Sequence, residues 1–414
     1  MASGPPVFRP EVLPGTAARA LAEPDASRRR IGWLDGIRGL AALFVAAAHA
    51  LLVNQPVGGA LTGNVWTEQE PVNTILRLIF TVSHQAVVAF IVLSGCSLML
   101  PVVARDGRLP NGVRDYFRRR MRRILPPYYA ALGLSLALTV AVPGMGAGLV
   151  PWWGEPNPSS DVVLSHLLLV HNWSPDWADA ISPPLWSIPV EWQIYFVFPL
   201  ILLPVWRRYG GNAAIGVGFA IGLGLYAAVG SQRLVLSAPW FIGLFAIGMV
   251  AADLGFSTRV RSADYGRLAV RVAWMGLIGF VIASATLFVT DLPFRANSWL
   301  VDPFFGVAAA AVIVWAAVGG QPSQPVVVRV LSSAPMTELG WFSYSLYLVH
   351  APILVLAAGG TRELANSPLG YAVAVSIGLV AALTASYVFH LAIERPFMPS
   401  RYVVRRATSS TRWK

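Results

Sequence analysis

Long apolar runs constrain the fold of this chain more than any other feature of its sequence. About ten of them are long enough to cross a lipid bilayer as a helix. They lie at about residues 33–53, 78–100, 124–143, 185–206, 212–229, 236–254, 268–290, 297–319, 341–360 and 369–392. Of the 414 residues, 56% are hydrophobic and only 12% are charged, whereas soluble domains carry about a quarter. The sequence therefore predicts an all-α, polytopic membrane bundle of about ten transmembrane helices.

Arginine clusters between the runs predict how the bundle is oriented. With ten spans, almost all clusters fall on the side of the N-terminus, including the eight arginines between residues 105 and 123. The opposite side carries only Arg77, Arg233, Arg295 and Arg362. By the positive-inside rule, both termini are cytoplasmic in a multi-pass protein of the cell (inner) membrane. The net charge of +11 thus reflects membrane topology, and nucleic-acid binding is not expected.

Composition also predicts three segments. Residues 1–30 are rich in proline and lack the apolar core of a signal peptide, so we expect a disordered cytoplasmic tail. Residues 31–397 form the transmembrane domain, and residues 398–414 form a basic cytoplasmic tail. One cysteine, Cys96, permits no disulfide framework, and the histidines lack a metal-ligand spacing, so no metal site is expected.

The longest connection on the outer side, residues 143–184, is rich in tryptophan and acidic residues and has no lysine or arginine. Its apolar stretch 162–170 is too short to span a membrane. Aromatic and acidic side chains together are typical of a sugar-binding surface. An aromatic belt at the membrane interface explains them equally well, and both interpretations stay open.

The first span carries charged and titratable residues that an apolar helix normally excludes. Arg38 and His49 are eleven positions apart, close to three helical turns, so both lie on one helix face about 16 Å apart along the axis. Ionisable groups inside a membrane usually face a protein interior or a wet cavity. His49 is therefore a candidate general base. The alternative is an interfacial Asp35–Arg38 pair with a structural histidine.

Other spans carry matching polar residues. Glu191 lies at a depth similar to that of His49, so it is expected to orient the imidazole, unless it only packs against Trp or Tyr. Arg120 and Arg123 share one helix face at the cytoplasmic entrance and are candidates for binding phosphates, although membrane topology alone also explains them. Further candidates for proton handling or substrate orientation are His84, Tyr344 and His350.

Five motifs together resemble one known family. They are Arg-x10-His at 38 and 49, FIVLSG at 90–95, Arg-x-x-Arg at 120 and 123, the segment with Trp186, Ser187, Glu191, Tyr195 and Pro199, and SYSLYLVHAPI followed by Ile-Glu-Arg-Pro at 393–396. In order and spacing the chain resembles the integral-membrane acyltransferase family three, the acyl-CoA-dependent O-acyltransferases, over residues 30–397. It departs from the family pattern at Cys96, where an aromatic residue is expected. An esterase-like domain after the last span, which some glycan-modifying members carry, is not expected here.

The resemblance implies acyl transfer from cytoplasmic acyl-CoA, acetyl-CoA being the common donor, to a hydroxyl of a carbohydrate or a small molecule. It implies His49 and Glu191 as catalytic residues and Arg38, Arg120 and Arg123 as the acyl-CoA site. The substrate-binding residues expected are His84, Ser94, Trp186, Tyr344 and His350. Acyl-CoA is a co-substrate here, and no permanently bound cofactor is expected.

Two other classes of function fit a membrane bundle with buried charges. A transporter of a polyprenyl-linked or small polar substrate would also need intramembrane ionisable groups. A scaffold or sensor would tolerate their replacement. Binding of acyl-CoA separates the first class from an acyltransferase. Direct transfer and a covalent acyl-histidine both agree with the sequence.

Overall fold

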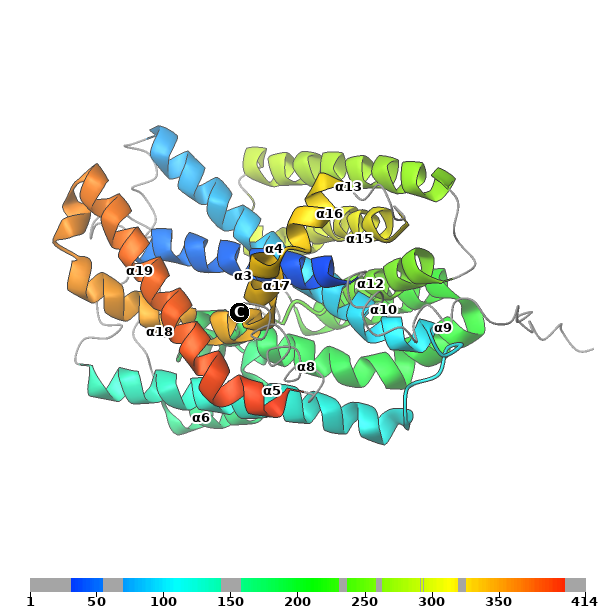
Figure 1. Ribbon diagram of the computed structural model, residues 1–414, viewed down its shortest axis with the longest axis horizontal. Coiled ribbons are helices and arrows are strands. Elements are labelled where there is room, and N and C mark those ends of the chain that lie inside the picture. The colour runs from blue at the N-terminus through cyan, green and yellow to red at the C-terminus, as the bar shows by residue number, and fades with distance from the viewer. Residues whose placement is uncertain are drawn as a thin grey trace, which may run out of the picture.

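The computed structural model is a bundle of helices that run roughly along one common direction (Figure 1). It describes residues 31–54, 70–142, 158–230, 237–257, 263–290, 292, 294–318 and 325–398, and these contain no β-strand. The predicted all-α fold is therefore confirmed. Residues 1–30 and 399–414, predicted to be tails, lie outside the described residues.

Eight helical segments of the described chain are long and apolar enough to cross a membrane. Two shorter apolar helices occupy the places of the sixth and eighth predicted spans, so the polytopic membrane fold is confirmed. The main helices are α3 (Gly32–Val53), α4 (Glu70–Val103), α5 (Gly112–Ala141), α8 (Ser187–Val197), α9 (Leu203–Tyr209), α10 (Gly211–Val229), α12 (Phe241–Phe256), α13 (Ala263–Val289), α15 (Asp302–Val318), α18 (Ser343–Thr361) and α19 (Pro368–Phe389).

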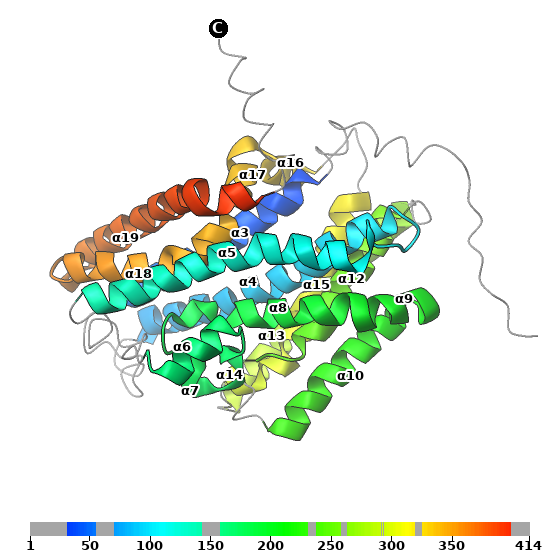
Figure 2. The same cartoon turned by 90° about the horizontal axis from the view of Figure 1, so that it is seen from below.

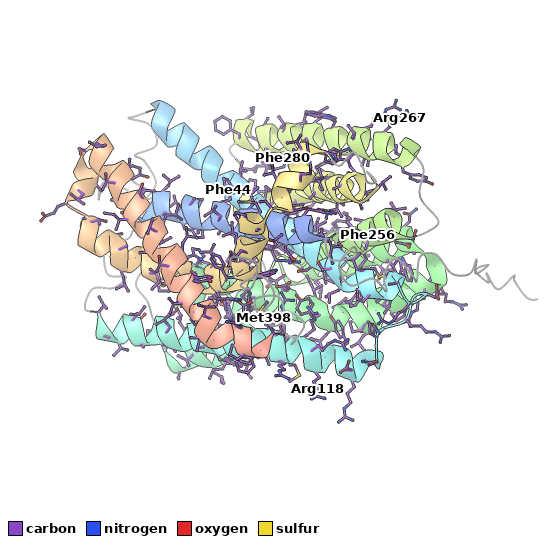
Figure 3. The ribbon with its side chains drawn as sticks, in the orientation of Figure 1. Phe44, Arg118, Phe256, Arg267, Phe280 and Met398 are labelled. Carbon is purple, nitrogen blue, oxygen red and sulfur yellow. The ribbon has the colours of Figure 1, made fainter. Side chains whose placement is uncertain are left out.

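The helices pass back and forth, so the bundle has two ends. We call the end at which α3 begins the inner end, and the end at which it finishes the outer end. Arg118 on α5 and Arg267 on α13 both project away from the bundle in its right-hand half, where these two helices begin (Figure 3). This arrangement agrees with the charge asymmetry of the connections.

Helix α12 lies at the centre of one half of the bundle and packs against α4, α10 and α15. Nearly all of its residues are apolar and most are buried, as expected for a helix enclosed by others. Its crossing with α4 is close, because a Cβ atom on Gly95 would lie 2.1 Å from the carbonyl oxygen of Phe245. By contrast, α13 exposes most of its apolar side chains, as expected for a helix that faces lipid.

Two short helices, α16 (Val326–Leu331) and α17 (Ala334–Trp341), cover the first turns of α3 (Figure 2). The approach is so close that a Cβ atom on Gly36 would lie 2.0 Å from the carbonyl oxygen of Leu331. Only glycine fits at position 36. The turn of α3 that carries Arg38 is therefore fixed by this packing.

The described part of the outer connection, residues 158–184, folds into short helices rather than a span, and we call it the outer cap. It contains α6 (Ser160–Leu167), η2 (His171–Trp173), α7 (Pro175–Ala178) and η3 (Pro183–Trp186). Tyr128 and Tyr129 of α5 donate hydrogen bonds to the carbonyl oxygens of His166 and Leu167, at 2.9 and 2.8 Å. The expectation that the stretch 162–170 does not span is thus confirmed. Trp152 and Trp153 lie outside the described residues.

Candidate active site

A pair of buried histidines joins α3 to α18. Nδ1 of His49 lies 2.8 Å from Nε2 of His350, and the two rings are nearly parallel, with centroids 5.1 Å apart. The other ring nitrogen of His350, Nδ1, lies 2.8 Å from the carbonyl oxygen of Leu346 in the preceding turn. Both side chains are buried. Apolar surroundings favour the neutral form of such imidazoles.

These contacts fix the position of each proton. A carbonyl oxygen can only accept, so Nδ1 of His350 carries a hydrogen and Nε2 carries the lone pair. That lone pair accepts a hydrogen bond from Nδ1–H of His49. The lone pair of neutral His49 is consequently on Nε2. This is the tautomer that a general base or a nucleophile at Nε2 requires.

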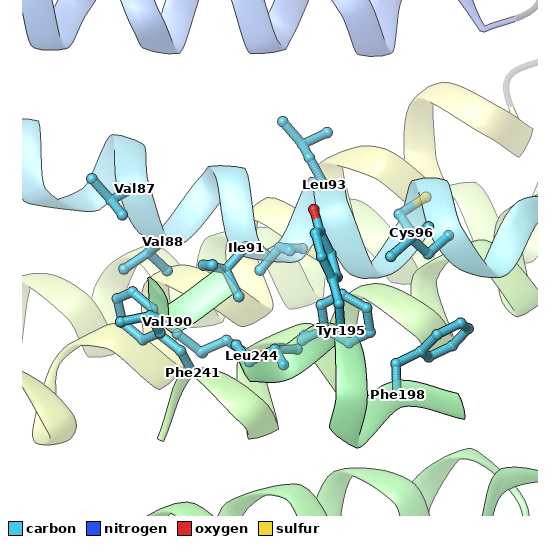
Figure 4. Close-up of a cluster of buried hydrophobic side chains, with 14 of the residues drawn as sticks. Val87, Val88, Ile91, Leu93, Cys96, Val190, Tyr195, Phe198, Phe241 and Leu244 are labelled. Atoms are coloured by element: carbon cyan, nitrogen blue, oxygen red, sulfur yellow. The ribbon is translucent and has the colours of Figure 1, made fainter. Parts of the chain in front are cut away.

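Glu191 of α8 lies in a second polar cluster. Its Oε1 accepts hydrogen bonds from the hydroxyls of Ser94 on α4 and Tyr195, one turn further along α8. Figure 4 shows the Tyr195 side chain reaching up towards α4 beside Leu93. At Nδ1 of His49 the structure places His350, where the sequence led us to expect Glu191. The catalytic roles of His49 and Glu191 stay predictions.

Arg120 extends this cluster towards the inner end. Its guanidinium lies over the ring of Tyr195, with CZ 5.9 Å from the ring centroid. The Nε atom is buried, and no described residue forms a hydrogen bond with it. Arg118 and Arg122 on the same helix are exposed, whereas Arg120 and Arg123 are half-buried. The predicted pair thus differs from Arg118 and Arg122 in its burial, whereas Arg119 is half-buried as well.

Arg38 and Tyr344 are held by other helices. Arg38 donates to Asp35 at 2.9 Å and to Ser97 of α4 at 3.0 Å. The Asp35–Arg38 pair considered as an alternative therefore exists, and it also binds α3 to α4. The hydroxyl of Tyr344 donates to the carbonyl oxygen of Ile124 on α5, at 3.2 Å.

The structure also brings together polar residues that were not predicted as site residues, although Ser187 and Glu394 lie in the five motifs and Tyr347 shares a helix face with His350. Tyr347 shares a hydrogen bond of 2.7 Å with Ser187 and lies beside His350, with ring centroids 6.0 Å apart. At the inner end, Glu394 accepts from Ser345 and contacts Nδ1 of His390. A spacing of four residues could have suggested His390 with Glu394. Partners on other helices gave no signal.

The outer end contains a further histidine–carboxylate contact. His84 of α4, one of the predicted substrate residues, lies 3.1 Å from the carboxylate of Asp302 at the start of α15. Trp186 of η3, another predicted substrate residue, has its ring parallel to that of His84. Asp302 was not predicted as a site residue. The only signal was a carboxylate at the start of an apolar run.

Comparisons with known proteins agree on one family. A family model described as an acyltransferase domain matches residues 31–391. "Acyltransferase MdmB" of Streptomyces mycarofaciens is 27% identical, over 92% of this chain and 95% of that protein. "O-acetyltransferase OatA" of Staphylococcus aureus is 23% identical, over 80% of this chain and 51% of its own length. "Peptidoglycan O-acetyltransferase OatA" of Listeria monocytogenes is 25% identical, over 80% and 50%.

The chain spans about half the length of the two OatA proteins and nearly all of the Streptomyces protein. No solved structure matches this chain significantly.

Proposed function

This chain belongs to the family of acyltransferases defined by that domain, and from this premise we propose that it uses acyl-CoA to acylate a hydroxyl group. The observation that carries the proposal is the His49–His350 pair, which sets the lone pair of His49 on Nε2 inside the bundle. We propose acetyl-CoA as the donor because two relatives are named O-acetyltransferases. The proposed location is the inner membrane, with both termini in the cytoplasm.

The donor enters from the inner end in this proposal. Arg120 and Arg123 are one helical turn apart and half-buried, so their guanidinium groups can bind the phosphates of acyl-CoA at the edge of the bundle. Arg38 adds positive charge on α3. The Glu191–Tyr195 contact positions the Arg120 guanidinium beneath the polar cluster.

The chemistry at His49 is the transfer of one proton and one acyl group. In direct transfer, Nε2 of His49 takes the proton of the acceptor hydroxyl while its oxygen attacks the thioester carbonyl. The carbon–sulfur bond breaks, and the CoA thiolate takes the proton from His49. In the covalent alternative, Nε2 attacks the thioester carbonyl first, the carbon–sulfur bond breaks and CoA leaves as a thiolate. The acceptor oxygen then attacks the acyl group, the bond from the carbonyl carbon to Nε2 breaks, and the hydroxyl proton passes to the CoA thiolate.

The acceptor enters from the outer end. One relative is named a peptidoglycan O-acetyltransferase, which supports a carbohydrate acceptor for that protein. We therefore propose a carbohydrate hydroxyl here, with a small-molecule hydroxyl as the broader class.

The test is consumption of labelled acetyl-CoA by the purified protein in nanodiscs with a carbohydrate acceptor present, and with His49→Ala alongside. We expect the wild type to release CoA and the variant to bind acetyl-CoA normally but release none. Thermal unfolding of both proteins controls for folding. Near-normal turnover by His49→Ala would refute the mechanism, and no acetyl-CoA binding by the wild type would favour a transporter.

A further inference from the structure

Asp302 is a buried carboxylate with three hydrogen-bond donors around it. Its Oδ1 accepts from the side-chain amide of Gln85 at 3.1 Å, and its Oδ2 accepts from Nε1 of Trp240 at 2.9 Å. Oδ2 also lies 3.1 Å from Nε2 of His84. The Asp302 side chain is completely inaccessible to solvent. A charge at this depth is costly, so it usually serves a site.

The carboxylate determines how His84 presents its second nitrogen. Because Asp302 accepts at Nε2, neutral His84 carries its proton there and its lone pair on Nδ1. No described residue forms a hydrogen bond with Nδ1. The side chain is 20% exposed, so it can be reached by a ligand. A hydroxyl group suits Nδ1 in either protonation state, since a hydroxyl both donates and accepts.

Aromatic rings surround this imidazole. The Trp186 ring is parallel to it with centroids 6.3 Å apart, and the Phe294 ring stands edge-on at 5.6 Å. Phe241 lies at 6.2 Å. Trp186 and Phe294 are half-buried, so part of each ring remains accessible. Aromatic surface beside a fixed polar atom suits a ligand that has both apolar faces and directional hydroxyls, which describes a sugar ring.

A short series of contacts connects this place with the His49 pair. Trp186, beside His84, is followed in the chain by Ser187, which shares a hydrogen bond with Tyr347. The Tyr347 ring lies next to His350, the partner of His49. The His84–Asp302 pair and the His49–His350 pair are therefore linked through the η3–α8 junction.

We propose that His84, held by Asp302 and flanked by Trp186, is the acceptor-binding subsite and takes a hydroxyl of a carbohydrate. This inference rests on the proposed function, because only a transferase needs an acceptor. Among the described residues, His84 is linked with His49 indirectly, through Trp186, Ser187, Tyr347 and His350. The hydroxyl bound at Nδ1 of His84 and the hydroxyl that is acylated are thus different groups of one polyhydroxylated acceptor.

Sugar binding tests the subsite without any acyl donor. Calorimetry on the nanodisc-bound full chain would use a panel of methyl pyranosides and a disaccharide of N-acetylglucosamine and N-acetylmuramic acid. We expect His84→Phe, which keeps a ring but loses Nδ1, to weaken binding about tenfold, as expected for one lost hydrogen bond. Trp186→Ala should weaken it as well. Trp274→Ala, on the exposed face of α13, is the matched control and should bind as the wild type does.

A second variant separates ligand contact from packing. His84→Asn replaces the ring by a smaller amide that can both donate to Asp302 and accept from a hydroxyl. It should bind sugar more tightly than His84→Phe does, although it fills the space less well. Thermal unfolding in nanodiscs checks that each variant is folded.

Each outcome decides the proposal. Wild-type affinity in both His84→Phe and Trp186→Ala would overturn the subsite, and absence of binding by the whole panel to the wild type would overturn the carbohydrate assignment. A failure of the proposed function looks different. In that case the wild type consumes no labelled acetyl-CoA, while sugar binding still depends on His84.

Discussion

His350 fixes the tautomer of neutral His49 through a contact with its own helix. Its Nδ1 is tied to the carbonyl oxygen of Leu346, so only Nε2 can accept from His49. Replacing His350 by phenylalanine keeps a ring of similar size but removes that acceptor. His49 is then no longer held with its lone pair on Nε2, and its Nδ1–H loses a buried partner.

We expect His350→Phe to lower kcat by about a hundredfold or more, the usual contribution of a positioned general base. The KM for acetyl-CoA should change little, because the proposed site for its phosphates, at Arg120 and Arg123, does not include His350. Steady-state kinetics in nanodiscs measures both quantities. Ser376→Ala on α19 is a control, since this exposed hydroxyl bonds only within its own helix. A wild-type kcat in His350→Phe would show that the pair is structural.

Arg120 and Arg118 form a matched pair on α5, two residues apart, of which one faces the bundle and the other is exposed. We expect Arg120→Ala to raise the KM for acetyl-CoA at least about tenfold, because a charge-assisted bond to phosphate is lost. Arg118→Ala should stay within about twofold, since exposed charges are screened. Initial rates measured against acetyl-CoA concentration give the KM of each variant. Equal changes of KM in the two variants would show that both arginines serve membrane topology.

Spacing within one helix was enough to propose Arg38 with His49 and Arg120 with Arg123, because helical periodicity puts each pair on one face. It could not reveal that His350 contacts His49, or that Asp302 contacts His84. Those pairs join helices far apart in the sequence, and their formation depends on how the helices pack. The depth argument for Glu191 led us to expect it beside His49, and it could not identify Ser94 on α4 as its partner.

At the level of elements, the close approach of α3 to the α16 segment rests on Gly36. A methyl group there would lie 2.0 Å from a backbone carbonyl oxygen, which cannot move aside as a flexible side chain does. Gly36→Ala should therefore force the helices apart. Overpacking of this kind typically costs about 1–3 kcal/mol.

We expect Gly36→Ala to lower the thermal unfolding temperature and to reduce acetyl-CoA turnover, because Arg38 lies half a turn away. Gly133→Ala is the matched control, since a Cβ atom at Gly133 of α5 meets nothing within 4 Å. Its unfolding temperature should be unchanged or higher, because alanine favours a helix over glycine by up to about 1 kcal/mol. If both variants melt like the wild type, the close approach does not limit stability.

Apolar length predicted the helices well, because a membrane helix must satisfy its backbone within one continuous segment. Apolar length was less informative at α12 and α15, which have only 16 and 17 residues. It also could not predict α16 and α17, which cover the first turns of α3. Short helices of this kind depend on contacts rather than on length.

For the whole molecule, the packing of the outer cap should make stability depend on pH. His166 and His171 are fully buried in the cap, and their rings stack with centroids 3.8 Å apart. Burial lowers the pKa of His166 to about 4. Burial, and then the nearby charge of His166, lower the pKa of His171 well below its usual value of 6.5. Both imidazoles are therefore neutral in the folded cap at neutral pH.

The sign of the effect follows from proton binding. Between pH 6.5 and about 4 the unfolded chain binds protons that the folded cap does not, so stability falls as the pH is lowered through this range. Above pH 6.5 the stability that the neutral histidines contribute is fully present. The part that His166 loses on acidification is on the order of 3 kcal/mol.

Thermal unfolding in nanodiscs at pH 7.5, 6, 5 and 4.5 measures how stability falls with pH. The double variant His166→Phe/His171→Phe keeps stacked rings but cannot titrate, so its slope should be smaller. Parallel curves for the two proteins would show that other groups cause the acid sensitivity. Asp161 is not such a group in this range, because hydrogen bonds from Ser159 and Trp177 hold its pKa below 3.8.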